Sequence, residues 1–394
     1  MILGRHPEAW QGGRARNVAF GVSEACQLRC RYCYVVGKSP RRMPFEIARR
    51  TIEYLLGHRA VFAERAVTWE FGIGEPLLEI ELIDQISDHL KRRLFELQHP
   101  WFDHYRFNLS TNGLLYDDAR VQRYIEKNRA HLSVGFSLDG TREKHDRQRV
   151  YPDGRGSYDD VVRNVPLWLE QFPEAHTKAT LGSGDLPYVK ESVLHLWSLG
   201  IKTVMMNVVF EEVWQEGDDE LFEDQLRQLA DHILEHDLYT RYNCTLFSDD
   251  IGHPLDPLRD NGNWCGAGQM LVVDAHGDFY PCHHFLRPSL VKRPPLVIGN
   301  CFTGLDFNRL RPFVALNRVV QSPPECVECE VASGCAYCKG LDYDESDTGT
   351  LYQRATYICK LHKAQVRANQ YYREQFRARV GADPTTRPEE APCP

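Results

Sequence analysis

The stretch that decides the fold of this chain lies at residues 24–34 and reads EACQLRCRYCY. It contains Cys26, Cys30 and Cys33, with three residues in the first interval and two in the second. Three thiolates on one loop can hold three irons of a 4Fe–4S cluster and leave the fourth iron open, whereas a cluster closed by four cysteines mainly transfers electrons. The spacing therefore predicts a reactive cluster. The competing interpretations are buried free cysteines or part of a zinc knuckle, although zinc usually takes paired ligands with a fourth close by.

The composition is that of a soluble globular protein with metal ligands. The 394 residues are 42% hydrophobic and 26% charged, enough for two or three domains with large cores. The net charge of -8 argues against a general nucleic-acid or anionic-membrane binder. No apolar run is long enough for a signal peptide or a membrane span. Thirteen cysteines without a secretion signal favour metal ligation over disulfides, so we expect a cytoplasmic, oxygen-sensitive protein.

Strand and helix patterns alternate over the first 240 residues. The predicted strands are 17–23, 66–71, 105–109, 131–138, 178–181 and 202–209, and the predicted helices are 44–56, 78–97, 117–127, 158–171, 188–199 and 218–236. Six such units with short connections predict an α/β fold with a parallel sheet and outer helices, here a partial (β/α)6 TIM barrel. Its active groups should gather at the carboxyl ends of the strands.

The pattern changes in the second part of the chain. Residues 240–350 are rich in Gly, Pro, Asp and Cys, with short strand signals such as MLVVD. A helix is predicted at 354–376, and the Pro-rich end of the chain is predicted to be disordered.

Small polar groups follow several of the predicted strands. They are Gly74, Glu75 and Pro76 after the second strand, Ser110, Thr111 and Asn112 at the end of the third, Ser137 and then Arg149 after the fourth, and Asn207 in the sixth. A glycine lets a ligand approach the backbone, a carboxylate suits a cationic amine, and hydroxyls suit sugar or carboxylate groups. Each of these residue types is also common in turns, but together they predict one binding site at the barrel rim.

Seven further cysteines form a second group, namely Cys265, Cys282, Cys326, Cys329, Cys335, Cys338 and Cys359. Two C-x-x-C pairs among them are compatible with a zinc site of four cysteine ligands. Only five residues separate the two pairs, which is tight for one ion, and three cysteines would then have no ligand role. Two iron–sulfur clusters account for the group better.

The cysteine loop, with Tyr32 before its third cysteine, resembles the signature of radical S-adenosylmethionine (radical SAM) enzymes. GIGEP at residues 72–76 is similar to the Gly-Gly-Glu-Pro motif that holds the methionine amino group in that superfamily, with Ile73 in place of the first glycine. The resemblance implies one SAM-binding 4Fe–4S cluster on Cys26, Cys30 and Cys33. It also implies that SAM is bound by Tyr32, Gly74, Glu75, Pro76, Ser110, Thr111, Asn112, Ser137, Arg149 and Asn207.

The second cysteine group resembles the SPASM domain of peptide-modifying radical SAM enzymes. By position, the resemblance implies an inner auxiliary 4Fe–4S cluster on Cys265, Cys282 and Cys338, and an outer one on Cys326, Cys329, Cys335 and Cys359. The fourth ligand of the inner cluster is left open between Cys244, Cys301 and a substrate thiolate. The implied domains are a lead-in at 1–16, a radical SAM partial barrel at 17–239, a SPASM domain at 240–378 and a disordered tail at 379–394.

Stretches such as WEFGIGEPLLE, NWCGAGQM and ECEVASGCAYC look most like maturases associated with CXXX-repeat precursor peptides. That likeness implies a sactionine- or ranthipeptide-type enzyme, which forms Cys thioether crosslinks after hydrogen abstraction by a 5′-deoxyadenosyl radical. The alternatives are a carbon–carbon (cyclophane-type) crosslinker, a peptide epimerase or, in another class, a non-catalytic zinc or iron–sulfur protein. The strand-end motifs argue against the last, because a binding module has no need of them.

One position bears on the related sulfatase-maturating enzymes, which carry an acidic base just after the second SPASM cysteine. Here that position is His283, which can still accept a proton and is the candidate catalytic residue. The implied partners are a Cys-containing precursor peptide and an electron donor such as flavodoxin or ferredoxin. Because only 16 residues precede the first predicted strand, no leader-binding domain is expected to be fused, and a separate leader-binding protein is a further candidate partner.

Overall fold

The computed structural model describes residues 15–248, 251–256 and 265–381. Most of the predicted lead-in lies outside these residues, as do residues 382–394 of the predicted tail, with Cys393. None of the cysteines within the described residues forms a disulfide.

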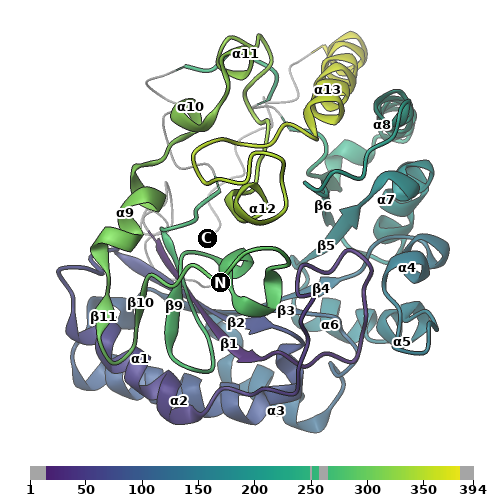
Figure 1. Cartoon of the computed structure of the whole chain (residues 1–394). Coiled ribbons are helices and arrows are strands. Elements are labelled where there is room, and N and C mark those ends of the chain that lie inside the picture. The colour runs from purple at the N-terminus through teal and green to yellow at the C-terminus, as the bar shows by residue number, and fades with distance from the viewer. Residues whose placement is uncertain (1–14, 249–250, 257–264, 382–394) are drawn as a thin grey trace.

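The described strands belong to one sheet (Figure 1). They are β1 (Ala15–Ser23), β2 (Ala66–Ile73), β3 (Tyr105–Thr111), β4 (Leu132–Ser137), β5 (His176–Leu181), β6 (Thr203–Val208), β7 (Asn243–Cys244), β8 (Met270–Val273), β9 (Asp278–Tyr280), β10 (Gly299–Asn300) and β11 (Gly304–Leu305). The order across the sheet is β11-β10-β9-β8-β1-β2-β3-β4-β5-β6-β7. Strands β1 to β7 pair in parallel, which confirms the predicted partial barrel.

Helices cover the outside of this curved sheet (Figure 1). Those of the barrel are α1 (Phe45–Gly57), α2 (Ile80–Glu96), α3 (Ala119–Asn128), α4 (Arg142–Gln148), α5 (Tyr158–Val162), α6 (Val165–Gln171), α7 (Val189–Ser198) and α8 (Asp218–Glu235). The later ones are α9 (Phe307–Ala315), α10 (Arg318–Gln321), α11 (Pro324–Val327), α12 (Lys339–Asp344) and α13 (Cys359–Val380). Short 3-10 turns lie at η2 (Pro76–Glu79), η3 (Pro100–Phe102), η4 (Arg129–His131), η5 (Ser183–Tyr188), η6 (Leu238–Thr240), η7 (His283–Phe285) and η8 (Arg287–Ser289).

The structure differs from the helix predictions in three places. The predicted helix at 158–171 is two helices, because Pro166 stands in the first turn of α6, where a proline starts a new helix. Helix α4, capped by the Thr141 hydroxyl, was not predicted. The predicted helix at 354–376 begins only at Cys359. The segment before it is not helical, and the buried Arg354 in that segment donates a hydrogen bond to Cys335 of the second cysteine group.

Alternation along the strands separates an apolar outer face from a polar inner face. In β3, for example, Phe107 and Leu109 are buried while Asn108 and Ser110 between them are accessible. The buried set packs against the helices, as where the Phe136 and Trp168 rings stack with centroids 4.4 Å apart. The polar set is thereby left on the inner face, where a small ligand could bind.

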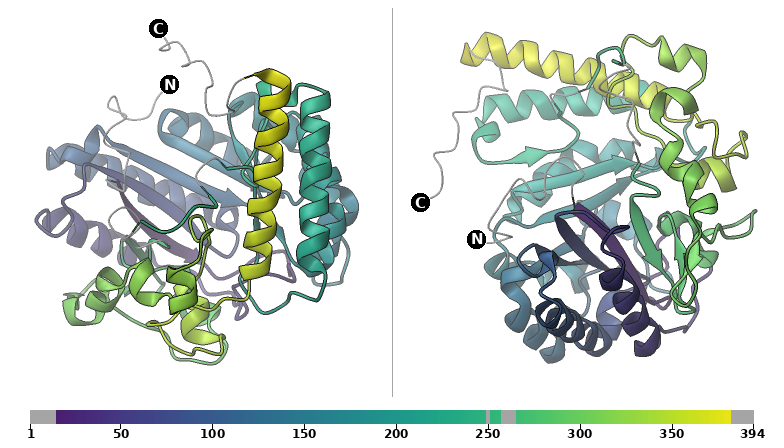
Figure 2. Two further views of the ribbon diagram at one scale, coloured as in Figure 1. Left: turned by 90° about the horizontal axis from the view of Figure 1, so that it is seen from above. Right: turned by 90° about the vertical axis from the view of Figure 1, so that its left-hand side faces the viewer.

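The cysteine-rich region joins the barrel at both ends of the sheet. Strand β8 pairs in parallel with β1, and β9, β10 and β11 continue the sheet as antiparallel strands. At the other end, α13 runs beside α8 (Figure 2), where Tyr371 donates a hydrogen bond of 2.6 Å to Asp231. Two attachments hold the region over the mouth of the barrel.

Candidate active site

The loop after β1 brings Cys26, Cys30 and Cys33 together. Burial, and then the nearby Glu75 carboxylate, raise the pKa of Cys26 to about 11. Burial raises the pKa of Cys30 as well, and Cys33 is among the neighbours that raise it further. The thiols of Cys26 and Cys30 are therefore protonated at neutral pH in the metal-free chain, and a metal that binds them must displace protons.

Hydrogen-bond donors approach two of these sulfurs. Cys26 Sγ accepts from the Leu28 amide at 3.4 Å and lies 3.8 Å from Asn112 Nδ2. Cys33 Sγ accepts from Lys38 Nζ at 3.0 Å. Donors of this kind favour thiolates over thiols, so the loop is chemically suited to metal-bound sulfur.

Glu75 is tied into the chain by its carboxylate, and its contact with a ligand amine stays a prediction. It is buried and accepts hydrogen bonds from the Leu77 amide at 3.1 Å, the Thr111 hydroxyl at 2.6 Å and the Asn112 amide at 2.8 Å. All three donors belong to the chain, so the carboxylate ties the end of β2 to the end of β3. By accepting from the Asn112 amide, Glu75 holds Asn112 beside the cysteine loop.

The backbone conformation around Gly74 shows why residue 74 is a glycine and how Ile73 replaces the first glycine of the family motif. A Cβ at Gly74 would lie 2.1 Å from the Ala25 carbonyl oxygen, so the cysteine loop can pass only over a glycine. Ile73 itself has a φ of 91°, a conformation that favours glycine and strains a β-branched residue. The backbone thus bends sharply at Ile73 although the glycine is missing.

Tyr32, Asp139 and Arg149 form a buried cluster next to the cysteine loop. The Tyr32 hydroxyl donates to Asp139 at 2.6 Å and accepts from Arg149 Nη1 at 2.7 Å. Arg149 is 7% exposed, and its Nε is buried without a hydrogen-bond partner within the described residues. The guanidinium therefore keeps a donor for an anionic ligand, which fits the carboxylate-binding role expected for Arg149.

The remaining predicted contact residues lie on the inner face of the sheet. Ser110 is exposed at the end of β3, Ser137 is half-buried at the end of β4, and Asn207 is exposed in β6. Pro76 is buried at the start of η2, below the cysteine loop. Ser110, Ser137 and Asn207 thus lie on strands of the same sheet, with their side chains at least partly accessible.

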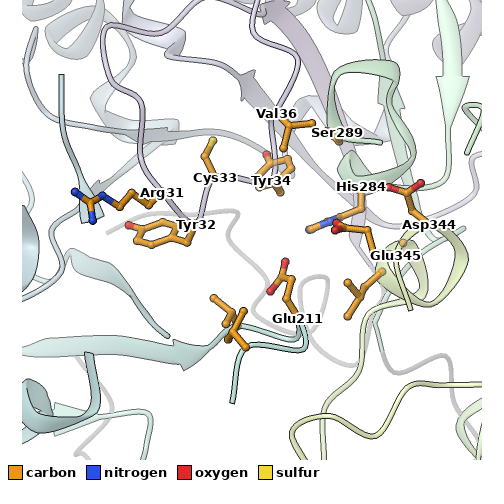
Figure 3. Close-up of a pocket in the computed structure, with 14 residues that line it drawn as sticks. Arg31, Tyr32, Cys33, Tyr34, Val36, Glu211, His284, Ser289, Asp344 and Glu345 are labelled. Carbon is orange, nitrogen blue, oxygen red and sulfur yellow. The ribbon is translucent and has the colours of Figure 1, made fainter. Parts of the chain in front are cut away.

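A cavity of about 220 Å³ opens between the cysteine loop and the cysteine-rich region (Figure 3). Its lining comes from the loop (Cys33, Tyr34), from the segment after β6 (Glu211), and from η7 and α12 (His284, Leu341). Tyr34 stacks on His284 with ring centroids 4.7 Å apart. Burial raises the pKa of the Tyr34 phenol, and the neighbours that add to the shift include both Cys33 and Cys282. Tyr34 therefore lies between the two cysteine groups.

Cys265, Cys282 and Cys338 lie close enough to act electrostatically on one another, and Cys282 and Cys338 each stand two residues before a residue that lines that cavity, His284 and Gly340 respectively. Burial raises the pKa of Cys282 to about 12, with Cys265 adding to the shift. Burial also raises the pKa of Cys338 strongly, with Cys282 and Cys265 as neighbouring charges. Neither other candidate cysteine joins them. Cys244 lies in β7 at the far end of the sheet, and Cys301 packs against Gly277.

His283 follows this group and faces Glu70 of β2. The distance from His283 Nε2 to Glu70 Oε1 is 3.7 Å, and both ring nitrogens of His283 are buried without a hydrogen-bond partner within the described residues. Burial would raise the pKa of Glu70, but His283, Asn17 and Lys178 together lower it. The imidazole is thus held beside a carboxylate that stays ionised.

Cys326, Cys329, Cys335 and Cys359 form a separate set. Burial raises the pKa of Cys359, and the neighbouring Cys335 and Cys329 raise it further. Burial also raises the pKa of Cys326, and Cys335 and Cys359 add to that increase. Arg354 Nη2 donates to Cys335 Sγ at 3.0 Å, and the buried Arg318 donates to the Cys335 carbonyl at 3.0 Å. Two buried cations suit a site of four thiolates, which would otherwise concentrate negative charge in a poorly solvated place.

Sequence reasoning missed several residues that the structure places in the site. Glu70 was visible as an acid within an apolar strand pattern, and Asp139 as an acid at a strand end. Lys38 and Arg354 carried no signal, because each reaches a sulfur through a turn of irregular chain. Among the residues that the structure describes, no three His, Cys, Asp or Glu side chains are arranged as ligands of a single metal ion. No described helix is long and apolar enough to cross a membrane.

Two curated proteins illustrate the sequence similarity of this chain to known proteins. The serine-type anaerobic sulfatase-maturating enzyme of Bacteroides thetaiotaomicron is 22% identical over 349 residues, which covers 80% of this chain and 80% of that protein. The cysteine-type enzyme of Clostridium novyi is 27% identical over 150 residues, 37% of this chain and 38% of that protein.

Two solved structures share the fold. The structure described as native anSMEcpe with bound AdoMet matches with a TM-score of 0.67 and 20% identity over 92% of this chain and 97% of that one. Streptococcus suis SuiB bound to the precursor peptide SuiA matches with a TM-score of 0.55 and 15% identity over 87% of this chain and 75% of that one. The model of the radical SAM superfamily matches residues 21–216. These residues contain the cysteine loop and strands β2 to β6, and the chain belongs to the radical SAM superfamily.

Proposed function

We propose that this chain is a radical SAM enzyme that forms thioether crosslinks in a ribosomally made, Cys-containing precursor peptide. Membership in the superfamily implies one 4Fe–4S cluster and SAM. Cys26, Cys30 and Cys33 would hold this cluster. When bound, the cluster and SAM supply a carbon-centred radical that removes a hydrogen atom from a substrate carbon.

The chain's own part at that site is to bind, orient and exclude water. In this proposal the Arg149 guanidinium binds the SAM carboxylate with its free donor, while Ser110, Ser137 and Asn207 line the inner face for the sugar and base. Glu75 holds Asn112 and the β3 end in place. Burial of Tyr32 between Asp139 and Arg149 closes the site on the loop side.

The observation that carries the thioether assignment is the number of cysteines beside the cavity. Three cysteines, not four, make up the inner group within the described residues, and Cys282 and Cys338 each stand two residues before a residue that lines the cavity. The same cavity is lined by Cys33 and Tyr34 of the SAM-binding loop. An inner cluster on Cys265, Cys282 and Cys338 would leave one iron for a substrate thiolate. Metal ligation deprotonates a thiol at neutral pH, which prepares the sulfur for bond formation.

The comparisons support a peptide or protein substrate. Relatives carry names of sulfatase-maturating enzymes, and neighbouring folds include anSMEcpe with a bound peptide and SuiB with its precursor peptide. A substrate segment that reaches the cavity would pass between the barrel mouth and α12 (Figure 3).

The outer group completes the proposal. Cys326, Cys329, Cys335 and Cys359 would hold a third 4Fe–4S cluster, closed by four cysteines, through which the surplus electron leaves to an acceptor. An electron donor such as flavodoxin or ferredoxin would supply the electron that reduces the SAM-binding cluster. The division into a radical SAM barrel at 17–239 and a SPASM domain at 240–378 belongs to the same proposal. So does the inference that a separate protein binds the leader.

Mass spectrometry of a Cys-rich peptide encoded beside the gene tests this function. The peptide is incubated anaerobically with reconstituted protein, SAM and reductant, and then treated with a thiol-alkylating reagent. A thioether predicts the loss of two hydrogens together with the loss of one alkylatable thiol. Loss of two hydrogens with every thiol still reactive would point instead to a carbon–carbon crosslink, and an unchanged mass despite SAM cleavage would point to an epimerase.

A second candidate is the oxidation of a Cys or Ser side chain in a protein substrate, as the names of the relatives indicate for them. The observation in its favour is Glu70, because its carboxylate lies beside His283 where those relatives are expected to carry an acid. Fragmentation of the product by tandem mass spectrometry separates the two candidates, because a thioether joins the sulfur to a second residue whereas oxidation changes the mass of one Cys or Ser residue alone.

A further inference from the structure

Lys38 is a cation in direct contact with the SAM-binding cysteine loop. Its ammonium donates to Cys33 Sγ at 3.0 Å and to the Val35 carbonyl at 2.9 Å. No carboxylate within the described residues forms an ion pair with it. Its charge is therefore directed at the sulfur and is not neutralised by an acid. Arg149 differs in this respect, because the Asp139 carboxylate offsets its charge.

The backbone on either side of Lys38 is fixed, which distinguishes this lysine from a mobile surface side chain. The Gly37 amide donates to the Pro288 carbonyl of η8 at 2.8 Å. The Ser39 hydroxyl donates to Glu24 at 2.5 Å, and the Glu24 amide donates to the Arg41 carbonyl at 3.0 Å. The segment is held between the barrel and the cysteine-rich region, so the ammonium is preorganised at the sulfur.

The field of this cation extends over the other two cysteines. Lys38 is among the charged groups near enough to act on both Cys26 and Cys30. A positive charge that favours thiolates also favours the more negative of two redox states of a cluster on those thiolates.

We propose that Lys38 is a positioning residue that sets the reduction potential of the SAM-binding cluster. This inference rests on the proposed function, since it requires the cluster on Cys26, Cys30 and Cys33. A lysine is charged at neutral pH, and its contact with Cys33 places that charge beside the electron that the cluster gains. Lys38 thus eases the one-electron reduction that must precede SAM cleavage.

Potentiometric electron paramagnetic resonance of the anaerobically reconstituted protein tests the proposal. The SAM-binding cluster is recognised by the change in its signal when SAM is added. Lys38→Met removes the charge, Lys38→Gln keeps a neutral donor, and Lys38→Arg keeps the charge. Arg29→Met is the matched control, because Arg29 lies on the same loop but donates to the backbone carbonyls of Cys26 and Leu28.

We expect Lys38→Met and Lys38→Gln to lower the reduction equilibrium constant of this cluster about tenfold or more, which is about 59 mV for one electron. Lys38→Arg and Arg29→Met should stay near the wild-type potential. Wild-type potentials in Lys38→Met and Lys38→Gln would overturn the proposal, as would loss of the cluster in all three Lys38 variants, since Lys38 would then be only a structural latch. A wild-type protein that forms no SAM-responsive cluster would contradict the proposed function itself.

Discussion

Ile73 shows how a single departure from a family motif is accommodated. Its φ of 91° is a conformation that glycine adopts freely and a β-branched residue adopts at a cost of about 1–3 kcal/mol. Its side chain is buried against Gly21, where an added Cβ would lie 2.2 Å from Ile73 Cδ1. The missing side chain at residue 21 makes room for the extra side chain at residue 73.

This pairing predicts a specific non-additivity. Gly21→Ala alone should destabilise the protein by about 1–3 kcal/mol, because the new methyl group overlaps Ile73. In an Ile73→Gly background the same substitution should cost at least about 1 kcal/mol less. Urea unfolding of the four proteins in the cycle measures the coupling. Costs that add within experimental error would contradict the account.

His145 is a buried residue whose protonation links pH to the geometry of the site. Its Nδ1 lies 3.3 Å from the Asp139 amide and its Nε2 3.0 Å from Ser157 Oγ, which in turn donates to the Arg149 carbonyl. Burial lowers the pKa of His145 to about 3. The ring is therefore neutral in the folded protein, where it accepts from Asp139 and donates to Ser157.

The lowered pKa predicts the sign of a pH effect. The unfolded chain binds a proton at His145 below about pH 6.5, whereas the folded chain does not, so stability is lost as pH falls. Between pH 6.5 and 5 the wild-type protein should lose about 2 kcal/mol through this residue. His145→Gln should remove that part of the slope in urea unfolding of the metal-free protein. Equal slopes in wild-type and His145→Gln proteins would disprove this linkage.

Helix α13 is the element that ties the cysteine-rich region back to the barrel. Its buried Asn369 accepts from the Ser248 amide at 2.7 Å and donates to the Leu246 carbonyl at 2.9 Å. The helix begins at Cys359 of the outer group, so this anchor also fixes one of the four thiols.

Asn369→Leu should therefore destabilise the protein by about 2 kcal/mol, because it leaves the Ser248 amide buried without a partner. Arg367→Ala, on the exposed face of the same helix, removes only an ion pair with Glu223 and should cost less than about 1 kcal/mol. Thermal or urea unfolding of both variants checks this order, and a reversed order would contradict the anchoring role of Asn369.

At the scale of elements, sequence patterns predicted what depends on local chemistry. The six parallel strands followed from their periodicity, and Ser110, Thr111 and Asn112 were placed correctly at the end of β3. Helix α4 was missed because only its Thr141 cap marks it, and Pro166 divided a helix that hydrophobic spacing made continuous. The role of Glu75 could not be read from the sequence, because its three hydrogen bonds depend on how β2 and β3 meet.

The whole molecule brings three cysteine groups together from segments far apart in sequence. Strand β8 extends the barrel sheet at β1, and Cys282 after β9 lies near enough to act electrostatically on Tyr34, which lines the cavity. The interleaved division of the seven later cysteines came from a resemblance and stays a prediction. It is compatible with the charges that act on Cys338, from Cys265 and Cys282, and with those that act on Cys326 and Cys359, from Cys335. Order in the chain alone could not suggest it, since Cys335 and Cys338 are neighbours in sequence but are assigned to different clusters.

Group-wise removal of cysteines should show this division in metal content. The anaerobically reconstituted protein should contain about twelve irons. Replacing Cys265, Cys282 and Cys338 together by alanine should leave about eight, and replacing Cys326, Cys329, Cys335 and Cys359 should also leave about eight. Iron and sulfide assays with zinc analysis measure these values. Zinc in place of iron, or loss of all iron from either variant, would refute the assignment.

Cleavage of SAM by the reduced protein tests the central claim most directly. The account predicts that wild-type protein, loaded with iron and reduced anaerobically, converts SAM to methionine and 5′-deoxyadenosine in equal amounts. It predicts that a variant with Cys26, Cys30 and Cys33 replaced by alanine forms neither product, although its two other cysteine groups still bind iron. Fully loaded wild-type protein that leaves SAM intact, or a triple variant that still cleaves it, would contradict the account.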